Sequence, residues 1–225
     1  MENFRPEAVP NPAVRRLSLY LRQLEAVQRQ DKRTISSKEL GESLALTDAQ
    51  VRKDLAYFGQ FGHPGIGYRV DDLIARVKHI LGTDRIWNVA LVGAGNLGRA
   101  LMAYRGFEKK GFHISAVFDT DPGKIGARRG PFVIQPLQEL EGTIQKMGIR
   151  LAIIAVPAET AQAVADKLVA AGVRGILNFA PVGLNVPPQV GLSGVDLAVQ
   201  LEQLSFLVNV SGQAQGQAPV TPQTS

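Results

Sequence analysis

The sequence predicts an α/β protein with an N-terminal winged helix-turn-helix domain, a Rossmann-like parallel-sheet domain after it, and a C-terminal helix. Three observations predict this class. Two short helices with capping signals are joined by a tight turn, apolar strands alternate with helices from Trp87 onwards, and a glycine-rich loop directly follows the first of these strands. We expect a winged-helix domain over residues 1–84, a Rossmann domain over 85–194, a C-terminal helix over 195–210 and a disordered tail over 211–225.

The composition excludes several classes of protein. The chain has 225 residues, of which 45% are hydrophobic, so it can bury a sizeable core. There is no membrane-length apolar run and no signal peptide in MENFRPEAVP, so we expect a soluble cytoplasmic protein. The absence of cysteine excludes disulfides and thiolate metal sites, and His63, His79 and His113 are not spaced as ligands, so we expect no metal. Any redox signal must therefore be carried by a bound ligand.

The charge distribution permits a nucleic-acid partner. The formal net charge is +5 and the sequence pI is about 9.6. Neither half of the chain is basic overall, but residues 15–38 hold seven basic side chains against Glu25 and Asp31. The basic residues of this cluster are Arg15, Arg16, Arg22, Arg29, Lys32, Arg33 and Lys38.

Three helices are predicted in the first half of the N-terminal domain. Pro12 suits a first helical turn, and apolar positions then recur at three- and four-residue spacing at Val14, Leu17, Leu21 and Leu24. A capping box over Ser36–Glu39 opens a short helix to about Ser43, and a second box over Thr47–Gln50 opens the next. The apolar stripe of that third helix consists of Val51, Leu55 and Phe58.

The segment after the third helix is typical of a wing. Residues 59–70 (GQFGHPGIGYRV) combine glycine and proline with aromatic and β-branched residues, which favours a hairpin-like loop. A short helix over Val70–Leu81 follows, and Gly82 suits the position just past its end.

From Trp87 the pattern becomes a succession of βα units. The strands are expected in NVALV, HISAVFD, PFVIQ, LAIIAV and GILNF, with helices between them, so the sheet is predicted to be parallel. After the last of these strands, Leu197, Leu201 and Leu204 recur at helical spacing over about 195–209, with no sheet partner evident for that helix.

The loop over Gly93–Gly98 (GAGNLG) predicts a dinucleotide site. It follows the strand NVALV and opens a helix from Arg99 to about Tyr104, the context in which this motif binds a pyrophosphate at the helix N-terminus. Asp119 ends the second strand, where a carboxylate binds the adenosine ribose hydroxyls and repels a 2′-phosphate, so NAD(H) is favoured over NADP(H). Alternatively, Asp119 caps the turn that follows it. The residues first assigned to the cofactor are Gly93, Ala94, Gly95, Asn96, Leu97, Gly98 and Asp119.

The third helix has the character of a DNA recognition helix. With Val51 at the buried centre, Ala49, Arg52, Lys53 and Ala56 fall on the opposite face, where two small residues allow close approach and two basic ones reach bases or phosphates. A solvated polar face is the alternative. The residues expected to contact DNA are Ser36, Lys38, Thr47, Ala49, Gln50, Arg52, Lys53 and Tyr57, with His63 and Arg69 from the wing.

Four strings together resemble one family. VRKDLAYFGQFGHPGIGY, GAGNLG, VFDTDP and GILNFAP are similar to the Rex family of bacterial redox-sensing transcriptional repressors, from the first helix to about Asn209. The resemblance implies a homodimer that binds an inverted-repeat operator, senses the balance of NADH and NAD+ without consuming either, and leaves DNA when NADH binds. It also implies that the C-terminal helix is swapped into the partner subunit.

The resemblance further implies roles for single residues. Tyr104 matches an aromatic that responds to the nicotinamide, and Arg22 and Asp196 match a pair that links the two domains. The loop beside the nicotinamide corresponds to Asn178, Phe179, Ala180 and Pro181.

Two other functions remain open from the residues alone. An NAD-dependent dehydrogenase needs a general acid or base near the nicotinamide, but His113 lies at the wrong end of a strand, Lys167 lies in a surface helix, and only Tyr104 is a candidate. We therefore assign no catalytic residue. A CoA-binding or other nucleotide-binding module, like those of acyl-CoA ligases, would give Arg52 and Lys53 no role.

Overall fold

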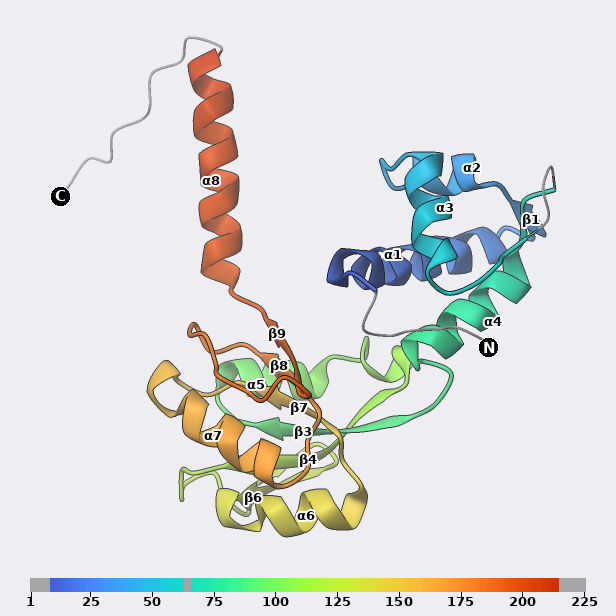
Figure 1. The fold of residues 1–225 in the computed structure, drawn as a ribbon. Helices are drawn as coiled ribbons and strands as arrows, with labels where there is room; N and C mark the ends of the chain where they lie inside the picture. The colour runs from blue at the N-terminus through green and yellow to red at the C-terminus, as the bar shows by residue number, and fades with distance from the viewer. Residues whose placement is uncertain (1–8, 63–65, 215–225) are drawn as a thin grey trace. The chain divides into compact units, whose positions relative to one another are not determined.

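The computed structural model describes residues 9–62 and 66–214, and its chain divides into two compact units at Ile86 and Trp87 (Figure 1). The sequence-based boundary lies at Asp84. In the first unit the elements are α1 (Asn11–Gln28), β1 (Thr34–Ile35), α2 (Ser37–Glu42), α3 (Asp48–Ala56), β2 (Tyr68–Arg69) and α4 (Val70–Leu81). Among the described helices of the whole chain, none is long and apolar enough to cross a membrane.

The core of the first unit is formed by all four helices and the small sheet. Leu17, Tyr20 and Leu24 of α1 are fully buried with Val51 of α3 and Val77 of α4. The apolar periodicity of α1 is therefore confirmed, with one correction: Val14 is 40% exposed, and Ala13 takes the buried position beside it. Position 13 lies four residues before Leu17, which places it on the same helix face.

The helix starts confirm one capping box and correct the other. The Ser36 side chain accepts from the Glu39 N–H, and Glu39 reaches back to the Ser36 N–H, so both halves of that box form. Thr47 accepts from the Gln50 N–H, but the Gln50 side chain turns to Asp54 instead of returning to the cap. A buried carboxylate within reach is a stronger acceptor for that amide, because its charge has left water.

The wing is made by strands distant in sequence. β2 pairs antiparallel with β1, Tyr68 opposite Ile35 and Arg69 opposite Thr34, so the end of the predicted wing pairs with the chain just before α2. Gly67 has φ +83°, and a Cβ added to it would come within 2.7 Å of the Ile35 carbonyl oxygen, which explains glycine at this close approach. Residues 63–65, including His63, lie outside the described residues.

The second unit is an α/β sandwich around a seven-stranded sheet. Its elements are β3 (Trp87–Val92), α5 (Asn96–Ala103), η2 (Glu108–Lys110), β4 (Phe112–Asp119), β5 (Arg128–Arg129), β6 (Phe132–Pro136), η3 (Leu137–Glu139), α6 (Leu140–Met147), β7 (Leu151–Ile154), α7 (Ala158–Ala170), β8 (Gly175–Asn178), β9 (Gly191–Gly194) and α8 (Leu197–Ala214). The strand order is β5-β6-β4-β3-β7-β8-β9, and every pairing is parallel except that of β5 with β6. The six parallel strands have the order of a doubly wound dinucleotide-binding sheet, which confirms the predicted class.

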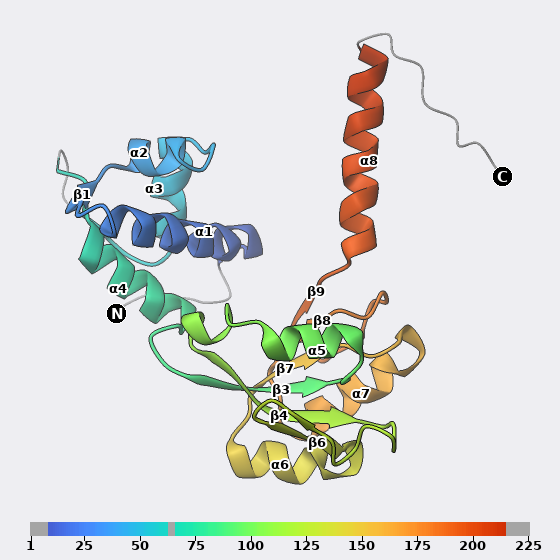
Figure 2. The ribbon, with the colours of Figure 1, turned by 180° about the vertical axis from the view of Figure 1, so that it is seen from behind.

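The sheet has a covered face and a partly covered one. Figure 1 and the reverse view in Figure 2 show α6 and α7 on one face and α5 on the other. Leu140 and Ile144 of α6 and Leu168 of α7 are buried in the first layer, and Leu101 of α5 packs against the second. A groove of about 570 Å³ remains on the second face beside β7, β8 and β9.

Two strands of the seven-stranded sheet were missed by the sequence reading. β5 is a two-residue arginine strand at the sheet edge, and β9 has the sequence GLSG with all four residues exposed. Neither has the apolar character of a buried strand, because each lies at an edge, where one side of the backbone is unpaired. α5 also begins three residues earlier than expected, at Asn96.

The C-terminal helix α8 extends beyond the predicted end at 210 to Ala214. The side chains of residues 197–211 are all exposed, including Leu201 at 67% and Phe206 at 65%. A helix that exposes apolar side chains on most of its sides is typical of one that is buried by a partner. Residues 215–225 of the predicted disordered tail lie outside the described residues.

Candidate functional site

The glycine-rich loop lies at the point where the strand order reverses. β3 neighbours both β4 and β7, and the loop leaves the carboxyl end of β3, where doubly wound sheets bind their ligands. Gly93 has φ +103°, and a Cβ there would come within 2.3 Å of the Ala155 carbonyl after β7. A Cβ on Gly98 would come within 1.9 Å of the Gly93 carbonyl, so the third glycine allows α5 to pack against β3.

Gly95 differs from the other two glycines. It is the N-cap of α5, its φ is −72°, and a Cβ would meet nothing within 4 Å in the described chain. The first backbone N–H groups of α5, those of Asn96, Leu97 and Gly98, have no acceptor among the described residues. The space in front of Gly95 is therefore open to an anion, with free donors and the positive end of a helix dipole behind it.

Asp119 is built into the base of this site. Its carboxylate is 9% exposed and accepts from the N–H of Ala94 at 2.8 Å and of Asp121 at 2.9 Å. Burial opposes its ionisation, but these two donors and Lys124, 3.3 Å away, together lower the pKa of Asp119. The carboxylate is therefore ionised and holds both the glycine loop and the turn that follows it, as the capping alternative predicted. It also lies at the strand end where the ribose binds in such folds.

Lys124 was missed by the sequence reading. Its ammonium lies 3.3 Å from Asp119 and 3.2 Å from Asp121, so it neutralises part of the negative charge at this strand end. The signal available in the sequence was a lysine in the turn after Asp119, three residues from Asp121.

The loop after β8 is fixed by Asn178. The side chain of Asn178 is 3% exposed, donates to the carbonyls of Ala180 and Val182, and accepts from the Ala180 N–H at 2.9 Å. The side-chain amide of Asn178 is therefore used by hydrogen bonds within its own loop. Its role is to fix the backbone of that loop, including Phe179 and Pro181. This loop leaves the same edge of the sheet as the glycine loop, since β8 is parallel to β7 and β3.

Tyr104 lies at the other end of α5 from the glycine loop. It is the C-cap of that helix, is 60% exposed, and packs edge-on against Phe107 with ring centroids 5.0 Å apart. It lines the groove on the second sheet face, which reaches Gly175 and Gly191 at the first residues of β8 and β9. Within one chain, about 12 Å of helix separate Tyr104 from the phosphate-binding loop.

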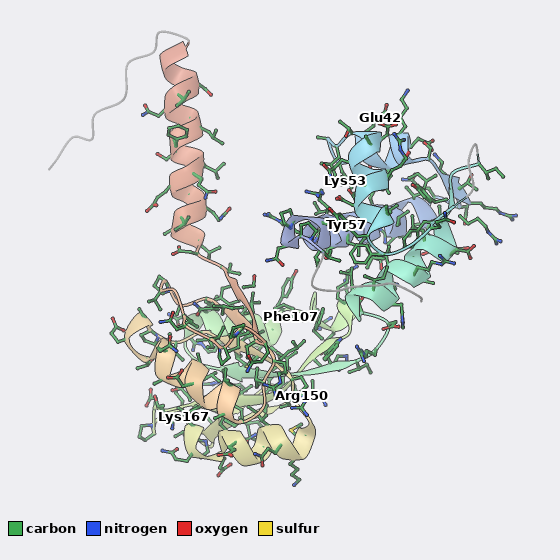
Figure 3. All side chains as sticks on the ribbon, viewed as in Figure 1. Glu42, Lys53, Tyr57, Phe107, Arg150 and Lys167 are labelled. Carbon is green, nitrogen blue, oxygen red and sulfur yellow. The ribbon has the colours of Figure 1, made fainter. Side chains whose placement is uncertain are left out.

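The exposed face of α3 carries the predicted DNA-reading residues. Ala49, Arg52, Lys53 and Ala56 are exposed, and Tyr57 at the helix end is half-buried. Figure 3 shows Lys53 on α3 and Tyr57 at the C-terminal end of that helix. No ion pair or hydrogen bond of Lys53 occurs among the described residues, whereas Arg52 is held by Asp48 and Ser37.

The other predicted DNA contacts border this face. Ser36 and Thr47 cap α2 and α3, Lys38 lies 3.9 Å from Glu42, and Arg69 lies 3.4 Å from Asp72. Apart from Ser36 and Gln50, which are partly buried, these side chains are exposed. The α2–α3 pair and the wing therefore present polar and basic groups together with two helix N-termini, which suits a phosphate backbone.

A buried polar network behind α3 was missed entirely. The Asp54 side chain is 1% exposed and accepts from Arg16 Nη2 at 2.7 Å, Tyr20 Oη at 2.7 Å and Gln50 Nε2 at 2.8 Å. Burial opposes ionisation, but these donors lower the pKa of Asp54, while burial and the same carboxylate raise the pKa of Tyr20. The network fixes the recognition helix to α1.

The residues expected to link the domains lie in different units. Arg22 on α1 has an exposed side chain, and Asp196 caps α8 by accepting from the N–H groups of Ala198 at 2.9 Å and Val199 at 3.2 Å. Because the two units are described separately, the pairing of Arg22 with Asp196 stays a prediction.

Fold and sites together define a class of protein: a winged-helix transcription regulator joined to a dinucleotide-binding domain. A family described as "Putative DNA-binding protein N-terminus" matches residues 8–56, and one described as "CoA binding domain" matches residues 84–182. The chain is 50% identical over 198 residues to a redox-sensing transcriptional repressor Rex of Carboxydothermus hydrogenoformans, covering 88% of this chain and 95% of that one. The chain belongs to the Rex family of redox-sensing transcriptional repressors.

Solved structures of a Rex-family repressor, RSP, match both units. RSP in complex with β-NADH has a TM-score of 0.83 and 36% identity, covering 93% of this chain and 98% of that one. RSP in complex with β-NAD+ and operator DNA has a TM-score of 0.86 and 37% identity, covering 94% and 99%.

These relatives decide between the alternatives left open by the sequence. They match across both units and are named repressors, so the protein is a regulator and not an enzyme. The two side chains set aside as general bases are both exposed: Lys167 on α7, as Figure 3 shows, and His113 near the start of β4. The CoA-binding description applies to the sheet domain alone.

Proposed function

We propose that this protein represses transcription by binding operator DNA and that NADH releases it, so that its occupancy follows the NADH/NAD+ ratio in the cytoplasm. The observation that carries this proposal is the presence, in one chain, of an open anion cradle at Gly95 and an exposed basic recognition helix. Relatives solved with β-NADH, and with β-NAD+ and operator DNA, support it.

The nucleotide is proposed to lie across the carboxyl ends of the strands. The loop Gly93–Gly98 takes the pyrophosphate, Asp119 takes the adenosine ribose, and Asn178–Pro181 border the nicotinamide. The ligand is proposed to be sensed and not consumed, as the names of the relatives, which are redox-sensing repressors, support. Tyr104 is about 12 Å of helix from its own loop, so its proposed response to the nicotinamide is exerted across a dimer.

The active form is proposed to be a homodimer in which α8 of each copy packs between the two units of its partner. Exposed apolar side chains on α8, such as Leu201, support this arrangement, as does the apolar groove beside β7, β8 and β9. Burial of such a helix is favourable by about 25 cal/mol for each Å² of apolar surface removed from water. Two winged-helix units related by a two-fold axis would then read an inverted repeat.

Ligand coupling in this proposal is a population shift. NADH must bind the DNA-incompetent geometry of the dimer more tightly than the competent one, because equal affinity for both shifts nothing. By reciprocity, operator DNA weakens NADH binding by the same factor. Arg22 and Asp196, one in each unit of a chain, are the proposed link between the two states.

The proposal is tested by fluorescence anisotropy of a labelled inverted-repeat operator at fixed salt, with NADH, NAD+ and NADPH added in turn. NADH is expected to release the protein and NADPH is not. If none of the three nucleotides changes DNA binding, the proposed coupling between NADH and DNA is wrong. If the protein does not bind DNA at all, the proposed repressor function is wrong.

Replacement of Asp119 by asparagine is expected to reduce the discrimination between NADH and NADPH about tenfold or more. A carboxylate near a 2′-phosphate costs about 4 kcal/mol at 4 Å in an effective dielectric constant of 20, and part of that is screened by Lys124. Asp121→Asn is the matched control, because it removes a charge from the same turn and also contacts Lys124. The affinities of each variant for NADH and NADPH are measured by titration calorimetry. If both variants discriminate equally between the two nucleotides, the adenosine ribose does not bind at Asp119.

A further inference from the structure

The guanidinium of Arg52 is held on the exposed face of the helix-turn-helix. Its Nη1 donates to Asp48 Oδ2 at 2.7 Å and to Ser37 Oγ at 3.2 Å. Ser37 is the first residue of α2 and Asp48 the first residue of α3, so Arg52 bridges the starts of both helices. Its side chain remains 55% exposed.

This arrangement leaves one edge of the guanidinium open. The two anchors engage Nη1, while no acceptor of Nε or Nη2 occurs among the described residues. Nε–H and Nη2–H form a fixed pair of donors, which matches the O6 and N7 acceptors that guanine presents in the major groove. A neighbouring carboxylate that fixes such a fork reduces the side-chain freedom lost on binding.

Lys53, the next residue, has the opposite character. No contact of its ammonium occurs among the described residues, and its side chain is a flexible stem with a point charge. Such a group suits phosphate, which is present at every sequence position, and carries little information about bases.

We propose that Arg52 reads a guanine of the operator and that Asp48 and Ser37 are positioning residues that hold its guanidinium for that contact. The proposal rests on the proposed function, since it requires operator binding. It assigns Asp48 two effects of opposite sign. Its charge repels DNA phosphates and weakens binding to every sequence, while its contact with Arg52 strengthens binding to the sequence that carries the guanine.

The test begins with a duplex that the wild-type protein selects from a pool of randomised inverted repeats. Anisotropy titrations at fixed salt then compare this duplex, each of its single base-pair replacements and an unrelated duplex. We expect a G·C pair whose replacement by A·T lowers wild-type affinity about tenfold or more, a preference that Arg52→Ala removes. Asp48→Ala is expected to reduce that preference severalfold and, at the same time, to raise affinity for the unrelated duplex.

Three controls separate positioning from charge and folding. Glu42→Ala removes an acid from the same helix-turn-helix without touching Arg52, and should raise affinity for all duplexes while the preference stays intact. Lys53→Ala should lower affinity for all duplexes equally. Asp48→Asn keeps an acceptor for Nη1 and should retain most of the preference, and Ser37→Ala should lower the preference without any change of charge.

Three outcomes overturn specific statements. A full G·C preference in folded Asp48→Ala and Ser37→Ala, checked by circular dichroism, overturns the positioning role. An Arg52→Ala variant that keeps the preference at every G·C pair overturns the guanine contact. A wild-type protein that selects no duplex instead overturns the proposed function.

Discussion

Replacing Leu204 and Leu207 together by glutamate is expected to convert the protein from a dimer to a monomer and to weaken operator binding about a hundredfold or more. Both side chains lie on α8 and are more than half exposed, at 56% and 58%. In the proposed dimer they are buried in the partner, where an unpaired carboxylate is strongly unfavourable. A monomer binds only one half-site. In a dimer, binding of one winged-helix unit raises the effective concentration of the other at the second half-site, and the monomer loses this gain.

The measurement combines sedimentation equilibrium with anisotropy on the inverted-repeat operator and on a single half-site. The double variant should bind both DNAs with similar, weak affinity, because it has lost only the link between two half-sites. Gln200→Glu together with Asn209→Asp adds charge to the same helix at polar positions and should affect dimerisation far less. A Leu204→Glu, Leu207→Glu variant that remains dimeric would show that α8 is not the dimer contact.

The architecture could be predicted because its signals are local. The capping box at Ser36 and the left-handed glycine at Gly82 each satisfy backbone groups within a few residues, and the glycine loop is a contiguous motif of six residues. Buried strands such as β7 are apolar on both faces, so their composition identifies them without knowledge of their neighbours. Edge strands lack this property, and β9 therefore has no signal in its sequence, GLSG.

The polar contacts of the sites depend on residues that are distant in sequence. Asp54 falls 60° from Val51 on the helical wheel, so its position on the inner face was available from periodicity. Its partners Arg16 and Tyr20 were not, because they come from α1 and meet it only when the helices pack. A buried acid on the apolar side of an amphipathic helix indicates that a donor exists but does not identify it.

Replacement of Gly95 by valine is expected to abolish the response to NADH while leaving the fold and operator binding intact. The described chain places nothing within 4 Å of a Cβ at this position, and the φ of −72° is one that valine adopts. The added side chain therefore projects into the space proposed for the pyrophosphate. Overpacking of about 3 kcal/mol would lower NADH affinity about a hundredfold.

The neighbouring glycine provides a control with the opposite phenotype. A Cβ on Gly98 would lie 1.9 Å from the Gly93 carbonyl, so Gly98→Ala must displace backbone and should lower the melting temperature of the protein itself. In wild type, NADH should raise the melting temperature through binding to the folded state, whereas Gly95→Val should melt normally and show no such increase. Gly95→Val that still gains stability with NADH and is still released from operator would show that the nucleotide phosphates do not lie over this loop, because a Cβ at this position projects into the space proposed for them.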